Sequence, residues 1–222
     1  MNIQLFTHQE EWVQASAKGI VDNLSLNLQT NDPVSLAVSG GSTPFPIYSS
    51  LSNYEIDWSN VTLIEVDERF VPVQSPESNW NNIASSLEKI SFYKTIYFEY
   101  NRDIYSMQQK VEEELPDSID VMVLGMGLDG HFASLFPGGE YWNHINNTKT
   151  LITEAPDTYL TTQRLSLSPE YIHKTNHIVV VISGKEKYEY LMTYLEQDNS
   201  ISQFPFQYLK NHPHIEVYCY LP

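Results

Sequence analysis

Hydrophobic positions follow two patterns along this chain, one with the period of a helix and one with the short apolar runs of buried strands. A 3.6-residue pattern opens the sequence and predicts a helix over residues 8–29, behind a capping box formed by Thr7 and Glu10. Apolar runs that end in polar or Gly-rich sequence predict buried strands at Val34–Val38, Val61–Val66, Ile119–Leu124 and His177–Ile182. Helical spacing between them predicts helices over residues 44–52, 79–90, 103–115 and 185–196.

Three further runs are less regular. Thr150–Glu154 and Arg164–Ser168 are candidates for extra strands, and His214–Tyr220 alternates like an edge strand. The alternation of strands and helices predicts a single α/β domain over residues 1–222, built on an open, mostly parallel twisted sheet with helices on both faces. Ligands of such sheets bind outside the carboxyl ends of the strands, so we expect the functional residues in the segments that follow the strands.

Composition and charge narrow the possible functions. Hydrophobic side chains make up 41% of the 222 residues, enough for a packed core, and 12 Lys and Arg against 28 Asp and Glu give a net charge of −16. This charge would repel a polyanion, so we expect no nucleic acid as a partner. The apolar run Ile178–Ile182 is far shorter than the roughly 20 residues that cross a bilayer, so we expect no membrane association.

Cysteine usage and the amino terminus indicate the compartment. The single Cys219 cannot form an internal disulfide, and the first residues lack the basic and apolar regions of a signal peptide. We therefore expect a cytoplasmic protein, present as a monomer or a weak homodimer.

The loop after the first predicted strand, residues 39–44, reads Ser-Gly-Gly-Ser-Thr-Pro. Its glycines allow the backbone to wrap closely around an anion, its hydroxyls add donors, and Pro44 suits the start of the next helix. This pattern is typical of a phosphate-binding loop. An ordinary strand-to-helix turn uses the same residue types, and the lysine of a P-loop is absent, so both interpretations stay open.

Asp67, Glu68 and Arg69 follow the second predicted strand. Arg69 is one of three arginines in the chain, and a fixed cation beside two carboxylates at a strand end suits the orientation of an anionic group. The alternative is a cluster of surface ion pairs, which contributes little to stability.

The loop after the third predicted strand, residues 125–131, reads Gly-Met-Gly-Leu-Asp-Gly-His. It has the spacing of a dinucleotide-binding loop, and Glu154 lies near the distance of a ribose-binding acid. That fingerprint needs a long helix at the glycines, whereas Pro137 interrupts the chain after less than two turns. The alternatives are a small-ligand site, in which Asp129 orients His131 as a general base, and a solvent-exposed loop histidine.

Two cations farther along the chain could reach an anion at the same edge of the sheet. Arg164 begins the run Arg-Leu-Ser-Leu-Ser, and Lys187 follows the most apolar predicted strand. Each alone is typical of a surface charge. Together with Arg69, they lie where a ligand could gather them and locally reverse the repulsion that an anionic substrate meets.

In this order, the motifs resemble those of the 6-phosphogluconolactonases, relatives of the glucosamine-6-phosphate isomerases and deaminases. The shared segments are SGGSTP at 39–44, DERFVP at 67–72, SN at 78–79, LGMGLDGHFASLFPG at 124–138, RLSLS at 164–168, GKEK at 184–187, and a tail from Pro205 onward. The long third motif is the specific one. The resemblance implies an open α/β fold, a phosphorylated sugar lactone as substrate, and neither a redox cofactor nor a required metal.

The resemblance also implies roles for individual residues. His131 would activate water, Asp129 would be its partner, and Arg69 would position the sugar or the developing charge. The residues expected to hold the phosphate are Ser39, Gly40, Gly41, Ser42, Thr43, Arg164 and Lys187. The expected substrate contacts are completed by Asp67, Glu68 and Gly127.

Two other functions compete with lactone hydrolysis. By the same resemblance, the sister deaminases carry a Glu at the position of Phe136 and use it in proton transfer, so an apolar side chain there disfavours isomerase or deaminase chemistry. The other function is a non-catalytic sugar-phosphate sensor. Such a regulator normally carries a DNA-binding element, and the sequence contains neither a helix-turn-helix pattern nor a basic patch.

Overall fold

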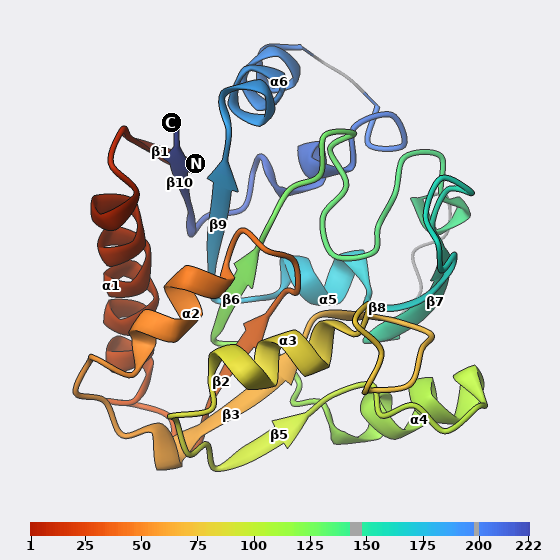
Figure 1. The fold of residues 1–222 in the computed structure, drawn as a ribbon, viewed down its shortest axis with the longest axis horizontal. Helices are drawn as coiled ribbons and strands as arrows, with labels where there is room; N and C mark the ends of the chain where they lie inside the picture. The colour runs from red at the N-terminus through yellow and green to blue at the C-terminus, as the bar shows by residue number, and fades with distance from the viewer. Residues whose placement is uncertain (143–147, 198–199) are drawn as a thin grey trace.

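A parallel sheet of seven strands forms the centre of the computed structural model, which describes residues 1–142, 148–197 and 200–222 (Figure 1). In chain order its strands are β1 (Asn2–Phe6), β2 (Val34–Val38), β3 (Val61–Glu65), β5 (Lys94–Ile96), β6 (Val121–Leu124), β9 (His177–Ser183) and β10 (Ile215–Tyr220). Their order across the sheet is β1-β10-β9-β6-β2-β3-β5. The order reverses between β2 and β6, and the crevice outside such a point is the usual ligand site of an open α/β sheet.

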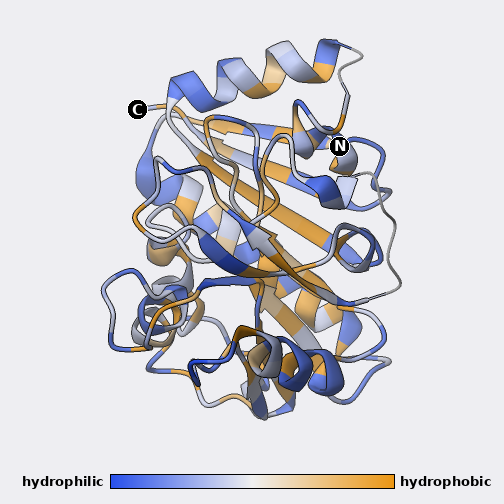
Figure 2. Ribbon diagram, turned by 90° about the vertical axis from the view of Figure 1, so that its right-hand side faces the viewer, coloured by the Kyte–Doolittle hydropathy of each residue, from blue (hydrophilic) through white to orange (hydrophobic). Residues whose placement is uncertain are grey.

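Hydrophobic cores lie on both faces of this sheet. Leu36 and Val38 point into one core and Ala37 into the other, because successive side chains of a strand alternate. The first core is covered by α1 (Gln9–Asn27), α2 (Phe45–Leu51) and α3 (Asn79–Ser86), and the second by α4 (Ile104–Glu114), α5 (Pro169–His173) and α6 (Lys185–Glu196). Burial on both faces explains why β2, β6 and β9 are nearly continuous apolar runs, which Figure 2 shows as a hydrophobic centre.

A second, antiparallel sheet adjoins the carboxyl edge of the first. Its order is β4-β8-β7, formed by β4 (Asp67–Arg69), β8 (Gln163–Leu167) and β7 (Thr150–Glu154). A single residue, Val66, separates the end of β3 from the start of β4, so the small sheet starts where the large one stops. Its register places Arg69 directly opposite Arg164.

The expected fold class is confirmed, and three local expectations are wrong. The capping box of Thr7 and Glu10 is not formed, since His8 is the N-cap of α1 and no side chain caps that end. β10 is not an edge strand, because β1 pairs with its outer side. α3 ends at Ser86 instead of residue 90, because Leu87 leaves the helical conformation.

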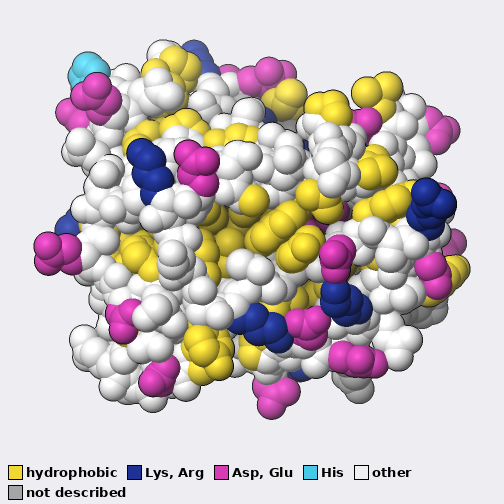
Figure 3. Space-filling view, turned by 60° about the horizontal axis from the view of Figure 1, so that its bottom comes forward, with side chains coloured by type: hydrophobic (Ala, Val, Ile, Leu, Met, Phe, Trp, Pro, Cys, Tyr) yellow, Lys and Arg dark blue, Asp and Glu magenta, His cyan; other side chains and the backbone are white. Residues whose placement is uncertain are grey.

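The surface combines charged and hydrophobic side chains. Figure 3 shows hydrophobic side chains in a hollow across one face, with charged side chains around it. Among the described residues, Leu160 is the most exposed large hydrophobic residue, at 93%. No helix within the described ranges is long and apolar enough to cross a bilayer.

Candidate active site

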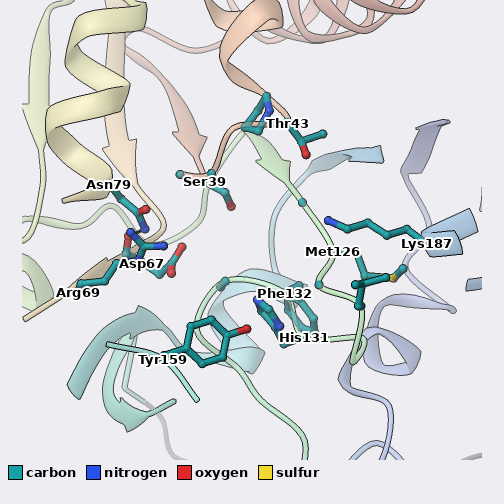
Figure 4. A pocket seen from close by; sticks show the side chains of 17 residues that line it. Ser39, Thr43, Asp67, Arg69, Asn79, Met126, His131, Phe132, Tyr159 and Lys187 are labelled. Atoms are coloured by element: carbon teal, nitrogen blue, oxygen red, sulfur yellow. Dashed lines mark hydrogen bonds between the residues drawn. The ribbon is translucent and has the colours of Figure 1, made fainter. Parts of the chain in front are cut away.

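Loops at the carboxyl edge of the large sheet enclose a cavity of about 350 Å³ (Figure 4). It is lined by Ser39, Gly40, Gly41, Thr43, Pro44, Asp67, Arg69, Asn79, Gly125, Met126, Gly127, Leu128, His131, Phe132, Ala133, Tyr159 and Lys187. The structure therefore brings the three motif loops and Lys187 together around one space. Of the predicted site residues, Ser42, Glu68, Asp129 and Arg164 lie outside its lining.

Close packing shapes the loop after β2. A side chain at Gly40 would collide with the Asn79 amide, and Gly41 has a φ of +93°, which favours glycine. The Asn79 amide in turn donates to the backbone oxygen of Asp67 at 2.8 Å. The Ser39 hydroxyl is buried, has no hydrogen-bond partner among the described residues, and points toward the cavity (Figure 4). The loop thus supplies an unpaired donor at the cavity wall.

The loop after β6 allows two side chains to lie directly against its own backbone. A side chain at Gly127 would collide with the His131 ring and the Asp129 carboxylate. The turn is closed by the Gly130 N–H, which donates to the Gly127 oxygen at 3.1 Å, and by the Gly127 N–H, which donates to the His131 oxygen at 2.8 Å. No helix begins at these glycines, since none of residues 131–137 is helical, so the loop lacks the geometry of a dinucleotide site.

His131 and Asp129 form an imidazole–carboxylate pair. Nδ1 of His131 lies 2.5 Å from Oδ1 of Asp129, and the His131 backbone N–H donates to the same oxygen at 3.2 Å. Burial disfavours the charge of Asp129, but the hydrogen bonds and charge of His131 outweigh burial and lower the pKa of Asp129. A carboxylate on Nδ1 keeps the proton there, so Nε2 retains a lone pair that can accept a proton from a ligand.

Asp67 joins the end of β3 to the loop that carries His131. Its side chain lines the cavity, and its Oδ2 accepts a hydrogen bond from the Ser134 hydroxyl at 2.6 Å. The Ser134 backbone N–H donates to the Ser166 hydroxyl of β8 at 3.3 Å. Asp67 therefore holds the segment after His131 in place while it faces the ligand space.

Glu68 serves the scaffold around the cavity. Its carboxylate accepts hydrogen bonds of 2.7 to 3.0 Å from the Ser78 hydroxyl and from the backbone N–H groups of Arg69, Asn79 and Trp80. Burial raises the pKa of Glu68, and these donors oppose that effect. The carboxylate thus anchors the start of α3 beside β4.

Arg69 and Lys187 reach the cavity from opposite sides (Figure 4). The Arg69 guanidinium donates to the backbone oxygen of Glu77. Lys187 forms no ion pair or hydrogen bond with the described residues. Burial lowers the pKa of its ammonium group, and the negative charge of Asp129 opposes this shift. A bound anion would offset the lost solvation of this cation.

Arg164 lies on the Arg69 side of the cavity. It is 3% exposed, and its guanidinium carbon is 5.6 Å from the centroid of the Tyr159 ring. Its Nε and Nη1 have no partner among the described residues. Burial and the charge of Arg69 lower the pKa of Arg164. The negative charges of Asp67 and Glu77 oppose this shift.

Several cavity residues carry no sequence signal that marks them as functional. Asn79 stands in one of the motifs without an assigned role, and Met126 and Phe132 lie within another. Tyr159 comes from the connection between β7 and β8, where no motif occurs. Only the folded arrangement brings this side chain to His131.

The chain matches the protein family described as glucosamine-6-phosphate isomerases/6-phosphogluconolactonase over residues 7–218. It belongs to this family. A 6-phosphogluconolactonase from Rhizobium meliloti is 37% identical over 148 residues, which cover 62% of each chain. One from Neisseria meningitidis serogroup A is 28% identical over 229 aligned residues, which cover 97% of this chain and 96% of the relative.

Solved structures of this family have the same fold. The 6-phosphogluconolactonase from Shewanella baltica superposes with a TM-score of 0.89 at 26% identity, covering 100% of this chain and 97% of the other. A monomeric glucosamine-6-phosphate deaminase, at 18% identity, superposes with a TM-score of 0.79 over 100% of this chain and 97% of its own. The fold therefore accommodates both activities, and the residues of the site have to distinguish them.

Proposed function

We propose that the protein hydrolyses 6-phospho-D-glucono-1,5-lactone to 6-phospho-D-gluconate, with His131 as the base that activates water. The chain is an enzyme of the 6-phosphogluconolactonase type, as its family and its relatives indicate, and such an enzyme serves the oxidative pentose phosphate pathway. The observation that carries the proposal is His131, paired with Asp129, in the lining of a cavity whose other end holds Lys187 and the loop after β2. One end supplies a base, and the other supplies donors for a phosphate.

In the proposed reaction, Nε2 of His131 takes a proton from water while the water oxygen attacks C1 of the lactone. The carbonyl electrons move onto their oxygen and give a tetrahedral oxyanion, which nearby donors stabilise. When this intermediate collapses, the bond between C1 and the ring oxygen breaks, and the imidazolium returns its proton to that oxygen. Asp129 keeps the ring oriented and stabilises the imidazolium between these steps.

We place the phosphate at the Lys187 end of the cavity. The Lys187 ammonium group and the hydroxyls of Ser39 and Thr43 line this end, and each could donate to phosphate oxygens. Arg164 lies on the opposite, Arg69 side and packs on the Tyr159 ring, so its role as a phosphate ligand stays a prediction from the family resemblance. Contacts this far from C1 bind and align the substrate, so they act mainly on KM.

Phe136 favours hydrolysis over deaminase chemistry. Its side chain is 4% exposed, and its ring centroid lies 4.6 Å from that of His131. No carboxylate therefore stands at the position where the deaminases are expected to carry one. His131 and its partner Asp129 remain as the base that the proposed hydrolysis needs.

A rate assay on freshly generated lactone tests the proposal, with spontaneous hydrolysis subtracted. We expect hydrolysis in proportion to enzyme concentration and no ammonia from glucosamine 6-phosphate. Ammonia release would favour the deaminase alternative. Tight binding of sugar phosphate with no hydrolysis above background would favour a sensor.

A further inference from the structure

Tyr159 is held beside the His131 ring by its neighbours. Its ring centroid lies 5.6 Å from that of Phe136 and 6.4 Å from that of His131, both in edge-on geometry. The Arg164 guanidinium packs on its ring, with the central carbon 5.6 Å from the centroid. Three contacts from two other segments therefore position a residue that belongs to none of the sequence motifs.

The loop that carries Tyr159 is itself tied down. The Tyr159 N–H donates to the Pro156 oxygen at 3.0 Å, and the Ala155 N–H donates to the Thr162 oxygen at 2.7 Å, which closes the loop at its base. The Thr161 hydroxyl donates to the Glu77 carboxylate at 3.1 Å. Since Glu77 also accepts a hydrogen bond from Arg69, this loop and the Arg69 segment form one wall of the cavity.

The Tyr159 hydroxyl points into the cavity, beside the His131 ring and across from Lys187 (Figure 4). It has no hydrogen-bond partner among the described residues. Burial and the negative charge of Asp129 raise the pKa of Tyr159, and the positive charges of Arg164 and Arg69 oppose this shift. The hydroxyl is therefore protonated near neutral pH, and it is a free donor at the end of the cavity where the base stands.

We propose that Tyr159 contacts the substrate directly and that its hydroxyl donates a hydrogen bond to an oxygen at the lactone end of the bound sugar. This inference rests on the proposed function for the identity of the ligand. It assigns the two ends of the cavity separate partners, with Tyr159 for the sugar ring and Lys187 for the phosphate. The ring of Tyr159 also shields one side of the imidazole from water.

Tyr159→Phe removes the hydroxyl and keeps the ring contacts. We expect its kcat/KM for the lactone to fall about tenfold, the size of one lost hydrogen bond to a ligand. Calorimetry should show about the same weakening for 6-phosphogluconate and none for inorganic phosphate, which occupies the other end of the cavity. Tyr105→Phe, on an exposed side chain of α4, and Leu160→Ala, in the same loop, are the controls and should match the wild type.

The two readouts separate this inference from the proposed function. If the wild type gave no hydrolysis above background, the proposed function would fail, while weaker binding of 6-phosphogluconate by Tyr159→Phe would still support the contact. Unchanged kcat/KM together with unchanged binding of 6-phosphogluconate would overturn it. An equal loss of phosphate binding would also overturn it, since that would mean a general disturbance of the cavity.

Discussion

The His131 ring is held on several sides by residues of its own loop. Asp129 binds Nδ1 at 2.5 Å, Gly127 leaves the space that the ring fills, and the Phe136 ring lies 4.6 Å away. These contacts fix the tautomer and the direction of Nε2, which a general base requires. The arrangement depends on Gly127, because any larger residue there would displace both members of the pair.

His131→Ala tests the role of this imidazole. We expect kcat for the lactone to fall by about 10²- to 10⁴-fold, the usual contribution of a positioned base, with a smaller change in KM. His8→Ala removes an exposed histidine at the start of α1 and is the control. Nearly full activity of His131→Ala in the rapid lactone assay would show that another group acts as the base.

Lys187→Ala tests the phosphate end of the cavity. We expect KM for the lactone to rise about tenfold or more with a smaller effect on kcat, because this cation would bind a group remote from C1. Lys185→Ala is a matched control in the same turn of α6, where Lys185 is exposed and pairs with Glu189 at 3.4 Å. A loss confined to kcat would place Lys187 at the reacting carbon and contradict the orientation of the substrate.

The helix α3 is anchored through a single buried carboxylate. Glu68 receives four donors, two of them backbone N–H groups from the first turn of this helix. Asn79, at the same end, packs against Gly40 of the loop after β2. The start of α3 thus connects the β4 segment to the proposed phosphate loop.

Glu68→Gln should weaken this connection. The Gln amide nitrogen is a donor, so it cannot accept the hydrogen bonds that a carboxylate oxygen of Glu68 accepts. We therefore expect the free energy of unfolding to fall by about 1–3 kcal/mol. Urea unfolding monitored by Trp fluorescence measures it, with the exposed Glu88→Gln as the control. Equal urea midpoints for the two variants would contradict the anchoring role.

Strands that are buried along their whole length are predicted from the sequence with nearly the correct bounds. β2 matches its predicted bounds, and β9 differs by one residue, because strands covered on both faces are continuous apolar runs. β1, β4 and β5 escape prediction, since segments of three to five residues carry too little periodicity. Their pairing partners lie far away in the chain, and only the fold supplies them.

In the candidate site, too, some features follow from local sequence and others depend on the fold. The loops after β2, β3 and β6 can be predicted to meet, because parallel strands end at one edge of the sheet. The saturation of Glu68 by backbone donors and the arrival of Tyr159 depend on contacts between distant segments. The pairing of Arg69 with Arg164 likewise follows from the register of the small sheet, which no local pattern specifies.

Four histidines gather at the amino ends of the strands, opposite the active site. His173, His177, His212 and His214 line a hollow of about 400 Å³, with ring centroids 5.1 Å apart for His177 and His214 and 5.3 Å apart for His173 and His212. Burial lowers the pKa of His177 and His212, and a neighbouring histidine lowers each further. Around His177, Glu216 and Asp120 oppose this shift.

These histidines should make the whole protein sensitive to acid. A histidine whose pKa is lower in the folded state binds fewer protons than in the unfolded chain, so its contribution to stability is present above about pH 6.5 and is lost as the pH falls below that value. We expect the urea midpoint of the wild type to fall between pH 7 and pH 5. The midpoint of His177→Gln should fall less over the same range. Parallel pH curves for the two proteins would contradict this origin.

In the proposed complex, one sugar phosphate spans the cavity, with its phosphate at Lys187 and its C1 end at His131. A crystal structure of the complex with 6-phosphogluconate measures this directly. We expect the phosphate within hydrogen-bond distance of Lys187 and the loop after β2, and a C1 oxygen within about 3.2 Å of Nε2 of His131, or one water away. A product bound in the reverse direction, or outside this cavity, would contradict the account.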